Sequence, residues 1–465
     1  MNERCGKNVS ESLKQGARPV YQTTFGKVDT LAGVLQNQMT YVASRQPEEN
    51  HLLLKNGCVI DPRNAVHAVR DIRIVSGVIA ETGEDLRPEP EEDVIDCEGL
   101  LVWPGLIDMH LHLGDLFEVS TGSIICAAQD GVTMGLSPGA GNTFMAPALL
   151  GAEVDRGVPM NLGVYLGGAS VLATQLSQEE LVQMFQGELD FETMSRKMTR
   201  NPITNTTAAL TVGIKDHMGH FIMPDESIES LFDLTARANL VYMSHTQDPE
   251  HAERMAALSK GRPLHLAHAT AAGCGSHGPA EESFRRVLAL VGGNISAEFV
   301  TSMLRPGRGS REGMQISAAA QELAYEALRT GLVKVLVSDG QNQSTMKGFG
   351  DTRDNIPAIL ELAQLGVLPL DGAVATMTSG PAALLAERTA NDWWTQKTGH
   401  LGVGALANIT VVDAADKLAT YTIVNGRIVS FENRLVRRGW GAGGWISRFG
   451  MLPRTGVGDL AMYSY

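Results

Sequence analysis

The middle of the chain alternates short apolar runs with amphipathic segments. Helical spacing of apolar residues is clear over 226–238, 281–291 and 316–330. Apolar runs of strand length recur between these helical patterns, at Leu106–His112, Val132–Leu136, Met160–Tyr165, Ala209–Lys215, Leu240–His245, Pro263–His268, Asn294–Phe299 and Val333–Asp339. Strands that alternate with helices are typical of βαβ units and a parallel sheet. Eight such strands within roughly 300 residues predict an α/β protein with a (β/α)8 TIM barrel.

Two β-rich blocks flank this region. Residues 51–103 and 398–436 are rich in β-branched residues and contain Asn-Gly pairs at Asn56-Gly57 and Asn425-Gly426, which favour hairpin turns. We therefore expect both blocks to form one small β-sandwich domain built from the two ends of the chain. Residues 104–397 are then the barrel domain.

The two termini have a different character. Residues 1–50 are polar with weak periodicity, and we assign this N-terminal extension no role. Residues 437–465 are rich in glycine and aromatic residues, as in Gly439–Trp445. This C-terminal tail is interpreted as an ordered segment or a subunit contact.

Composition narrows the class of protein. The formal net charge of −14 argues against a nucleic-acid partner, because phosphate binding requires a basic surface. Five scattered cysteines do not form a disulfide framework. No apolar stretch approaches the ~20 residues that a membrane span requires, and the N-terminus lacks the apolar core of a signal peptide. We expect a soluble cytoplasmic protein that binds no membrane.

Candidate chemistry lies where the predicted strands end. Functional side chains of a TIM barrel occupy the C-terminal ends of its strands. The first, fourth, fifth, sixth and eighth predicted strands end in residues that can bind metal ions, namely His110, His112, Lys215, His245, His268 and Asp339. Imidazole and carboxylate groups in this number are typical of a metal centre.

The two-residue period of a strand refines this set. His110 and His112 lie on the same face of the first strand, and Asp339 shares a face with three valines of the eighth. On the sixth strand His268 and His265 fall on opposite faces. We therefore predict that His268 is a ligand and that His265 packs towards the helices.

The same residues belong to motifs that resemble a known family. Pro104–His112 resembles the opening signature of the amidohydrolase superfamily. Further motifs resemble its dihydroorotase, hydantoinase and allantoinase branch, namely Gly131–Thr133 with Gly141–Thr143, His245–Asp248, His265–His268, Ile295–Val300, Val337–Asp339, Ser379–Ala383 and Gly402–Asn408. The resemblance covers about residues 51–430 and, with so many motifs combined, it is specific.

This resemblance implies a binuclear metal centre. In that branch the lysine at the end of strand four is carboxylated and bridges two divalent ions, which would make Lys215 the bridging ligand. His110, His112 and Asp339 would complete the first ion's ligands. His245 and His268 would complete those of the second. The resemblance also implies that Asp339 is the catalytic acid and base. Zn²⁺ is favoured, and Mn²⁺, Fe²⁺ and Ni²⁺ suit the same ligands.

Three departures concern the substrate pocket. Dihydroorotases hold the substrate carboxylate with an arginine where this chain has Gly114, and they have a Pro-His pair in place of Thr301-Ser302. Their eighth-strand motif continues with histidines where this chain reads Gly340–Gln343. Dihydroorotate is therefore disfavoured as the substrate. The predicted substrate contacts are Asn142 and the basic residues Arg305 and Arg308, which could replace the missing arginine.

The sequence thus predicts a metal-dependent hydrolase that cleaves the C–N bond of a small cyclic amide, such as a hydantoin, a dihydropyrimidine or allantoin. Two alternatives remain open. One is an N-acyl-amino-acid deacetylase or isoaspartyl-dipeptidase-like amidohydrolase, and the other is a non-catalytic scaffold protein related to dihydroorotase. A mononuclear deaminase is less favoured because those relatives do not use a lysine on strand four. The resemblance further implies a homo-oligomer.

Overall fold

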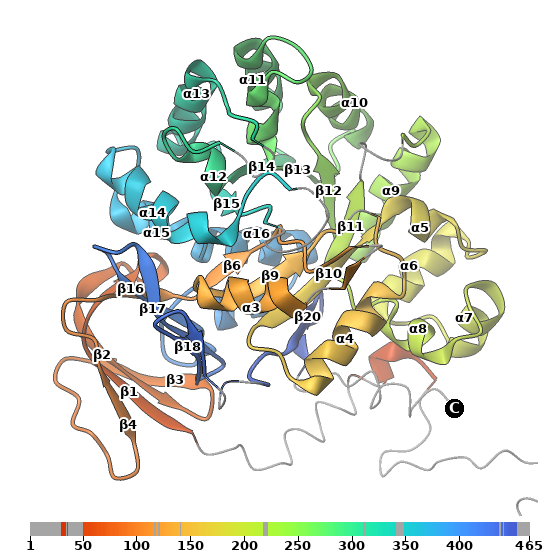
Figure 1. Ribbon diagram of the computed structural model, residues 1–465. Helices are drawn as coiled ribbons and strands as arrows, with labels where there is room; N and C mark the ends of the chain where they lie inside the picture. The colour runs from red at the N-terminus through yellow and green to blue at the C-terminus, as the bar shows by residue number, and fades with distance from the viewer. Residues whose placement is uncertain are drawn as a thin grey trace, which may run out of the picture.

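The computed structural model describes residues 29–33, 35, 50–115, 118–119, 121–139, 141–216, 222–309, 313–340, 348–436, 439 and 441–452. Most of the N-terminal extension and the last thirteen residues of the tail lie outside these ranges. The described chain forms a central parallel sheet surrounded by helices and a second sheet to one side (Figure 1).

All eight predicted barrel strands are present in the central sheet. Their order along the sheet follows their order in the chain, and every pair is parallel. The strands are β6 (Leu106–Asp108), β9 (Val132–Ser137), β10 (Asn161–Gly167), β11 (Gly213–Asp216), β12 (Val241–His245), β13 (Leu264–Ala267), β14 (Ile295–Val300) and β15 (Val335–Val337). Parallel neighbours place all their C-terminal ends at one rim.

The first and last of these strands also make contact. Leu111, just beyond β6, forms a parallel bridge with Gly340, just beyond β15. The carboxylate of Asp108 accepts hydrogen bonds from the backbone N–H of Ser338 and of His110, each at 3.2 Å. Burial raises the pKa of Asp108 to about 6 although these hydrogen bonds oppose the shift. Asp108 thus links strand one to strand eight directly beside the candidate ligands.

Helices connect the strands and cover the outside of the sheet (Figure 1). The predicted helices appear as α9 (Asp225–Ala238), α11 (Ala280–Leu288) and α13 (Ala318–Arg329). The other helical segments are α3 (Thr121–Gln129), α4 (Ala146–Arg156), α5 (Gly168–Leu172), α6 (Gln178–Gln186), α7 (Phe191–Lys197), α8 (Pro202–Thr207), α10 (Pro249–Ser259), α12 (Thr301–Leu304), α14 (Asn355–Gln364), α15 (Leu370–Ala375), α16 (Ser379–Thr389), α17 (Trp393–Lys397), η1 (Pro62–Asn64), η2 (Ala269–Cys274) and η3 (Thr352–Asp354). Among the helices of the described residues, none combines the length and apolar character needed to cross a bilayer.

The β-rich blocks from both ends of the chain meet in one nine-stranded sheet. Its strands are β1 (His51–Asp61), β2 (Val66–Val75), β3 (Val78–Gly83), β4 (Asp93–Asp96), β5 (Leu101–Pro104), β16 (Ile409–Asp413), β17 (Leu418–Val424), β18 (Arg427–Phe431) and β19 (Arg434–Leu435). The blocks join where β16 pairs antiparallel with β5, with Ile409 opposite Pro104. Buried residues such as Leu52, Ile74 and Ile423 form a core of its own. A two-layer sandwich stays a prediction.

A separate apolar cluster packs along one face of the strands of the central sheet. It contains inward side chains such as Met134, Met243 and Val337, together with Leu385 of α16 and Trp394 of α17. Helix α16 contacts both β6 and β12. Val335 and Val337 belong to this cluster as predicted, whereas Val333 packs in the outer cluster because β15 begins only at Val335.

The C-terminal tail contributes a strand to the central sheet. β20 (Trp445–Ser447) pairs in parallel with β10 at Leu162, and it forms a hairpin with β21 (Gly450–Leu452). The fourth barrel strand was predicted to begin at Ala209, but β11 begins at Gly213. The backbone before it is occupied by the tail, since Leu210 O accepts the indole N–H of Trp445 at 3.0 Å and Thr211 O accepts the N–H of Arg448 at 2.9 Å.

We expect Trp445→Ala to destabilise the whole barrel. The indole is 1% exposed and would leave both a cavity and an unpaired carbonyl at Leu210. Removal of a buried tryptophan typically costs about 3–5 kcal/mol. Urea denaturation followed by circular dichroism measures this loss. Trp393→Ala, which truncates a partly buried neighbour, is the control and should cost less. An equal or smaller loss for Trp445→Ala would show that the tail is dispensable.

Asp130, in the turn between α3 and β9, should make stability depend on pH. Burial raises the pKa of its carboxyl to about 7, against a hydrogen bond from Thr352 Oγ1 and with the help of the nearby Asp351 charge. A raised pKa means that the folded state binds the proton more tightly, so stability falls as pH rises from about 4 to 7. The fall is at most about 4 kcal/mol, since one pKa unit corresponds to about 1.36 kcal/mol. Asp130→Asn should flatten this part of the pH profile of the urea midpoint, and an unchanged profile would contradict the assignment.

Candidate metal centre

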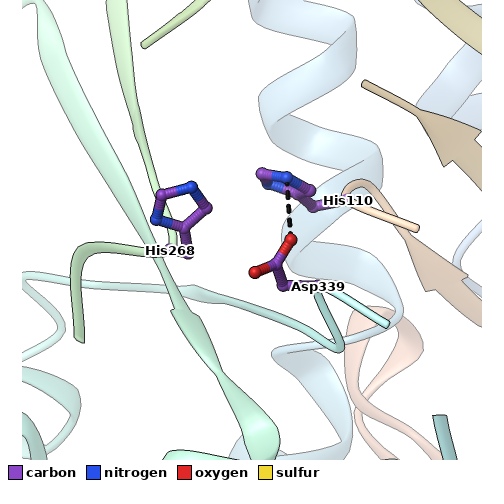
Figure 2. Close-up of side chains that lie close together, drawn as sticks. All are labelled: His110, His268 and Asp339. Atoms are coloured by element: carbon purple, nitrogen blue, oxygen red, sulfur yellow. Dashed lines mark ion pairs between the residues drawn. The ribbon is translucent and has the colours of Figure 1, made fainter. Parts of the chain in front are cut away.

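The rim formed by the strand ends brings all six candidate ligands together. His110 and His112 follow β6, Lys215 lies in β11, and His245 ends β12. His268 follows β13 directly and Asp339 follows β15. Figure 2 shows His110 directly above the Asp339 carboxylate, with an ion pair drawn between them, and His268 to their left. All six residues are buried or nearly so.

The contacts within this group are short. His110 Nε2 lies 3.0 Å from Asp339 Oδ1, and His112 Nε2 lies 3.3 Å from the same oxygen. Lys215 Nζ is 3.2 Å from His110 Nε2. The rings of His245 and His268 are 4.6 Å apart, and those of His110 and His268 are 5.1 Å apart. His110, His268 and Asp339 each offer one ligand atom, and these three atoms all lie within 4.8 Å of one another.

His268 and Asp339 reach the centre through unusual backbone geometry. Both have positive φ angles, +38° and +46°, which are uncommon for residues with a side chain. Backbone strain of this kind tends to persist at functional positions. In both residues it ends the strand and redirects the side chain, so the two-residue alternation no longer decides where it points.

The electrostatics suit ligands that bind cations. Burial, together with the neighbouring Lys215 charge, lowers the pKa of His245 to about 3. Burial also lowers the pKa of His268 well below its usual value. Burial alone would raise the pKa of Asp339, but His110 and His112 hold it well below its ordinary range. These shifts favour neutral imidazoles at His245 and His268 and a carboxylate anion at Asp339, which are the forms in which these groups bind metal.

The sixth strand corrects one prediction from the sequence. Leu264 and Leu266 pack in the outer cluster, so the face assigned to His268 is the outer face. His265 lies on the inner face, where its Nε2 is 2.9 Å from Glu298 Oε2. His268 nevertheless points inward because of its positive φ. The prediction that His265 packs towards the helices was therefore wrong.

Glu298 of β14 is a functional candidate that the sequence reasoning missed. Its carboxylate, which is fully buried, contacts His110 Nδ1 at 2.5 Å and accepts the backbone N–H of His268 at 3.1 Å. Burial would raise its pKa, but His110 and His265 outweigh that effect and hold the pKa well below its usual value. A signal was available in the sequence, because a glutamate within an apolar strand is rarely buried unless it is paired.

The three predicted substrate contacts lie in surroundings that differ from those of the candidate ligands. Asn142 is buried in the loop after β9, where its side-chain amide donates to the carbonyl of Tyr165 at 3.1 Å. Arg305 pairs with Glu361 at 2.9 Å and also with Asp354. Arg308 pairs with Asp354 at 3.2 Å. The two arginines line a surface pocket that none of the six candidate ligands lines. Substrate binding by these three residues stays a prediction.

The residues present fit metal ions. Ligand atoms of His110, His268 and Asp339 all lie within 4.8 Å of one another, which suits a centre whose two ions are about 3.5–4 Å apart. His268 Nδ1 is buried and has no hydrogen-bond partner within the described part of the chain. Nitrogen and oxygen donors of this kind suit Zn²⁺ and the neighbouring divalent metals.

Comparison with known proteins agrees with this geometry. The model of the amidohydrolase family matches residues 101–430, which include every candidate ligand. The chain belongs to the amidohydrolase family. This family is metal-dependent and its members hydrolyse C–N bonds, so this amidohydrolase is an enzyme. Its histidine and aspartate side chains are metal-ligand types that suit a metal-dependent family.

Individual relatives of this amidohydrolase share a low but extended similarity. A dihydroorotase of Geobacter sp. (strain M21) is 23% identical over 420 residues, covering 78% of this chain and 90% of the relative. A dihydroorotase of Aquifex aeolicus (strain VF5) is 23% identical, covering 78% of this chain and 89% of the relative. The solved structure of L-hydantoinase (dihydropyrimidinase) from Arthrobacter aurescens covers 85% of this chain and 99% of its own, with a TM-score of 0.62 at 17% identity. This likeness shows the hydantoinase-type TIM-barrel fold.

Proposed function

We propose that this amidohydrolase opens a small cyclic amide by hydrolysing its C–N bond at a binuclear metal centre. The observation that carries the proposal is the cluster of four histidines, a buried lysine and an aspartate at one rim of the parallel sheet. Relatives named dihydroorotase and hydantoinase act on cyclic amides, as their names state, and they span nearly the whole chain. The names of these relatives favour a cyclic amide over an acyl amino acid or a dipeptide.

The chain's own residues divide into two ligand sets. His110, His112 and Asp339 would hold one divalent ion, and His245 with His268 would hold the other. Lys215, carboxylated on Nζ, would contribute one oxygen to each ion. A buried lysine is a suitable site for this modification, because burial favours the neutral amine that reacts with carbon dioxide. When bound, such ions lower the pKa of water and polarise a carbonyl oxygen. Zn²⁺ is our preferred metal.

Asp339 would move the proton in this reaction. Its Oδ1 faces His110 and His112, while Oδ2 accepts the backbone N–H of Phe349 at 2.9 Å. These contacts hold the carboxylate in one orientation and as an anion, which a general base requires. Asp339 would accept a proton from the attacking water and then deliver it to the leaving nitrogen. The C–N bond breaks as the nitrogen is protonated, and the product carries a free carboxylate.

The substrate is proposed to be a hydantoin, a dihydropyrimidine or an allantoin-like ring. Dihydroorotate carries a carboxylate, and the position of the arginine that would hold it is Gly114 in this chain. A ring without that carboxylate needs no such arginine. The proposal also includes a closed (β/α)8 barrel and a β-sandwich domain formed by both ends of the chain. It further includes a cytoplasmic location and a homo-oligomeric state.

A substrate panel tests the proposal. Zinc-loaded protein is incubated with hydantoin, 5,6-dihydrouracil, allantoin, dihydroorotate and N-acetyl amino acids, and ring opening or acetate release is followed by proton NMR. We expect a ring-opened product from at least one ring that lacks the carboxylate, and none after metal removal. Cleavage of N-acetyl amino acids alone would support the deacetylase alternative. A loaded protein without any activity would support a scaffold.

A further inference from the structure

A chain of buried polar side chains runs along the barrel interior towards the candidate metal centre. Arg388 of α16 donates to Ser296 Oγ at 3.3 Å, and Ser296 Oγ lies 2.9 Å from His265 Nδ1. His265 Nε2 is 2.9 Å from Glu298 Oε2, and the other oxygen of Glu298 is 2.5 Å from His110 Nδ1. This polar column therefore connects α16, which packs against the interior cluster, to a candidate ligand at the rim.

The column is unusual in its surroundings. The remaining side chains of the interior cluster are valine, methionine, alanine and other apolar residues. A buried carboxylate is costly there unless it is paired and hydrogen-bonded. Glu298 meets this condition with three contacts, two to imidazole nitrogens and one to the backbone N–H of His268. Two of these three contacts involve residues of the proposed metal site.

The direction of the hydrogen bonds decides the state of His110. A carboxylate only accepts, so the proton between Glu298 and His110 lies on Nδ1. In the neutral ring Nε2 then carries a lone pair, and it faces the negative Asp339 Oδ1 at 3.0 Å. Two acceptors at this distance need a positive group beside them, and Lys215 Nζ already lies 3.2 Å from the same Nε2. A divalent ion also meets this requirement, with Nε2 as the ligand atom.

We propose that Glu298 is a positioning residue for the metal centre, which fixes the tautomer and orientation of His110 and the backbone of His268. His265 in turn holds Glu298 in place through the second carboxylate oxygen. The inference rests on the proposed metal site and adds residues that touch neither ion. Histidine ligands commonly donate their other ring nitrogen to a carboxylate, and loss of that partner typically weakens metal binding by about 10–100-fold.

The test is the Zn²⁺ affinity of Glu298→Gln, measured on the metal-free full-length protein by competition with a chromophoric chelator. Glutamine keeps the size and one acceptor oxygen but removes the charge. The expected result is about 10–100-fold weaker Zn²⁺ binding. Asp71→Asn is the matched control, since Asp71 is a buried carboxylate paired with Lys55 at 2.8 Å in the separate small sheet. The control should lose stability without losing Zn²⁺ affinity.

The outcomes separate the inference from the function. Wild-type protein that binds no Zn²⁺ would overturn the metal site itself. Equal Zn²⁺ affinity in wild type and folded Glu298→Gln would overturn only the positioning role. If Glu298→Gln does not fold, His265→Phe replaces it, because phenylalanine keeps a ring but cannot donate to Oε2. That variant should bind Zn²⁺ several-fold more weakly, and an unchanged affinity would equally contradict the proposal.

Discussion

Asp339→Asn is expected to lower kcat by about 10²–10⁴-fold while the protein stays folded, because asparagine cannot accept a proton from the attacking water. The amide oxygen can still face His110 and His112, so the neighbouring side chains keep their positions. The measurement is steady-state kinetics on the substrate identified by the panel, with metal content determined by elemental mass spectrometry on the same sample.

The metal content of the Asp339→Asn variant decides between a proton-transfer role and a ligand role for Asp339. Activity that falls with the metal retained supports a proton-transfer role for Asp339. Activity that falls together with the metal reduces its role to that of a ligand. Near-full turnover with metal bound would show that another group moves the proton. Asp416→Asn, which removes an exposed carboxylate in the turn between β16 and β17, is the control and should leave kcat within about twofold, as surface substitutions usually do.

Lys215→Ala is expected to remove most of the bound metal. A two-metal site holds about two ions per chain, and the loss of the shared ligand should leave fewer than one. Turnover should fall with the metal, since both ions depend on the same side chain in this proposal. Elemental mass spectrometry of the purified variant measures the effect.

The carboxylation of Lys215 can be tested separately by supplying carbon dioxide as bicarbonate. Metal-free wild-type protein loaded with Zn²⁺ in bicarbonate buffer should take up more metal than protein loaded without it. Lys215→Ala should show no such difference. Lys334→Ala, which removes an exposed lysine before β15, should retain the full metal content. A single ion that is unaffected by loss of Lys215 would instead indicate a mononuclear amidohydrolase.

Much of the fold could be predicted from the sequence, because apolar periodicity reports directly on burial. Every predicted barrel strand is found, and the errors concern where strands begin and end. β11 begins at Gly213 instead of Ala209 because the tail bonds to Leu210 and Thr211. No local pattern in residues 209–212 reveals a partner from the C-terminus, so this boundary required the tertiary structure.

The candidate site could be predicted from the sequence for a different reason. Parallel strands bring their C-terminal ends to one rim, so residues that end separate strands are neighbours whatever their separation in the sequence. The details were not readable, because the positive φ angles of His268 and Asp339 break the alternation on which face assignment depends. That is why His265 was assigned to the helices, whereas Glu298 was missed although a glutamate within an apolar strand was a signal.

The tail strand also constrains when this protein can fold during its synthesis. β20 supplies Trp445 to the edge of β10 at Leu162, so two segments from opposite ends of the barrel sequence must pair. A ribosome releases the chain from the N-terminus at about 5–20 residues per second, and domains generally fold as units. The central sheet therefore reaches its native pairing only after translation has passed residue 445. Until then the carbonyl groups of Leu210 and Thr211 lack the hydrogen bonds that Trp445 and Arg448 donate to them in the folded protein.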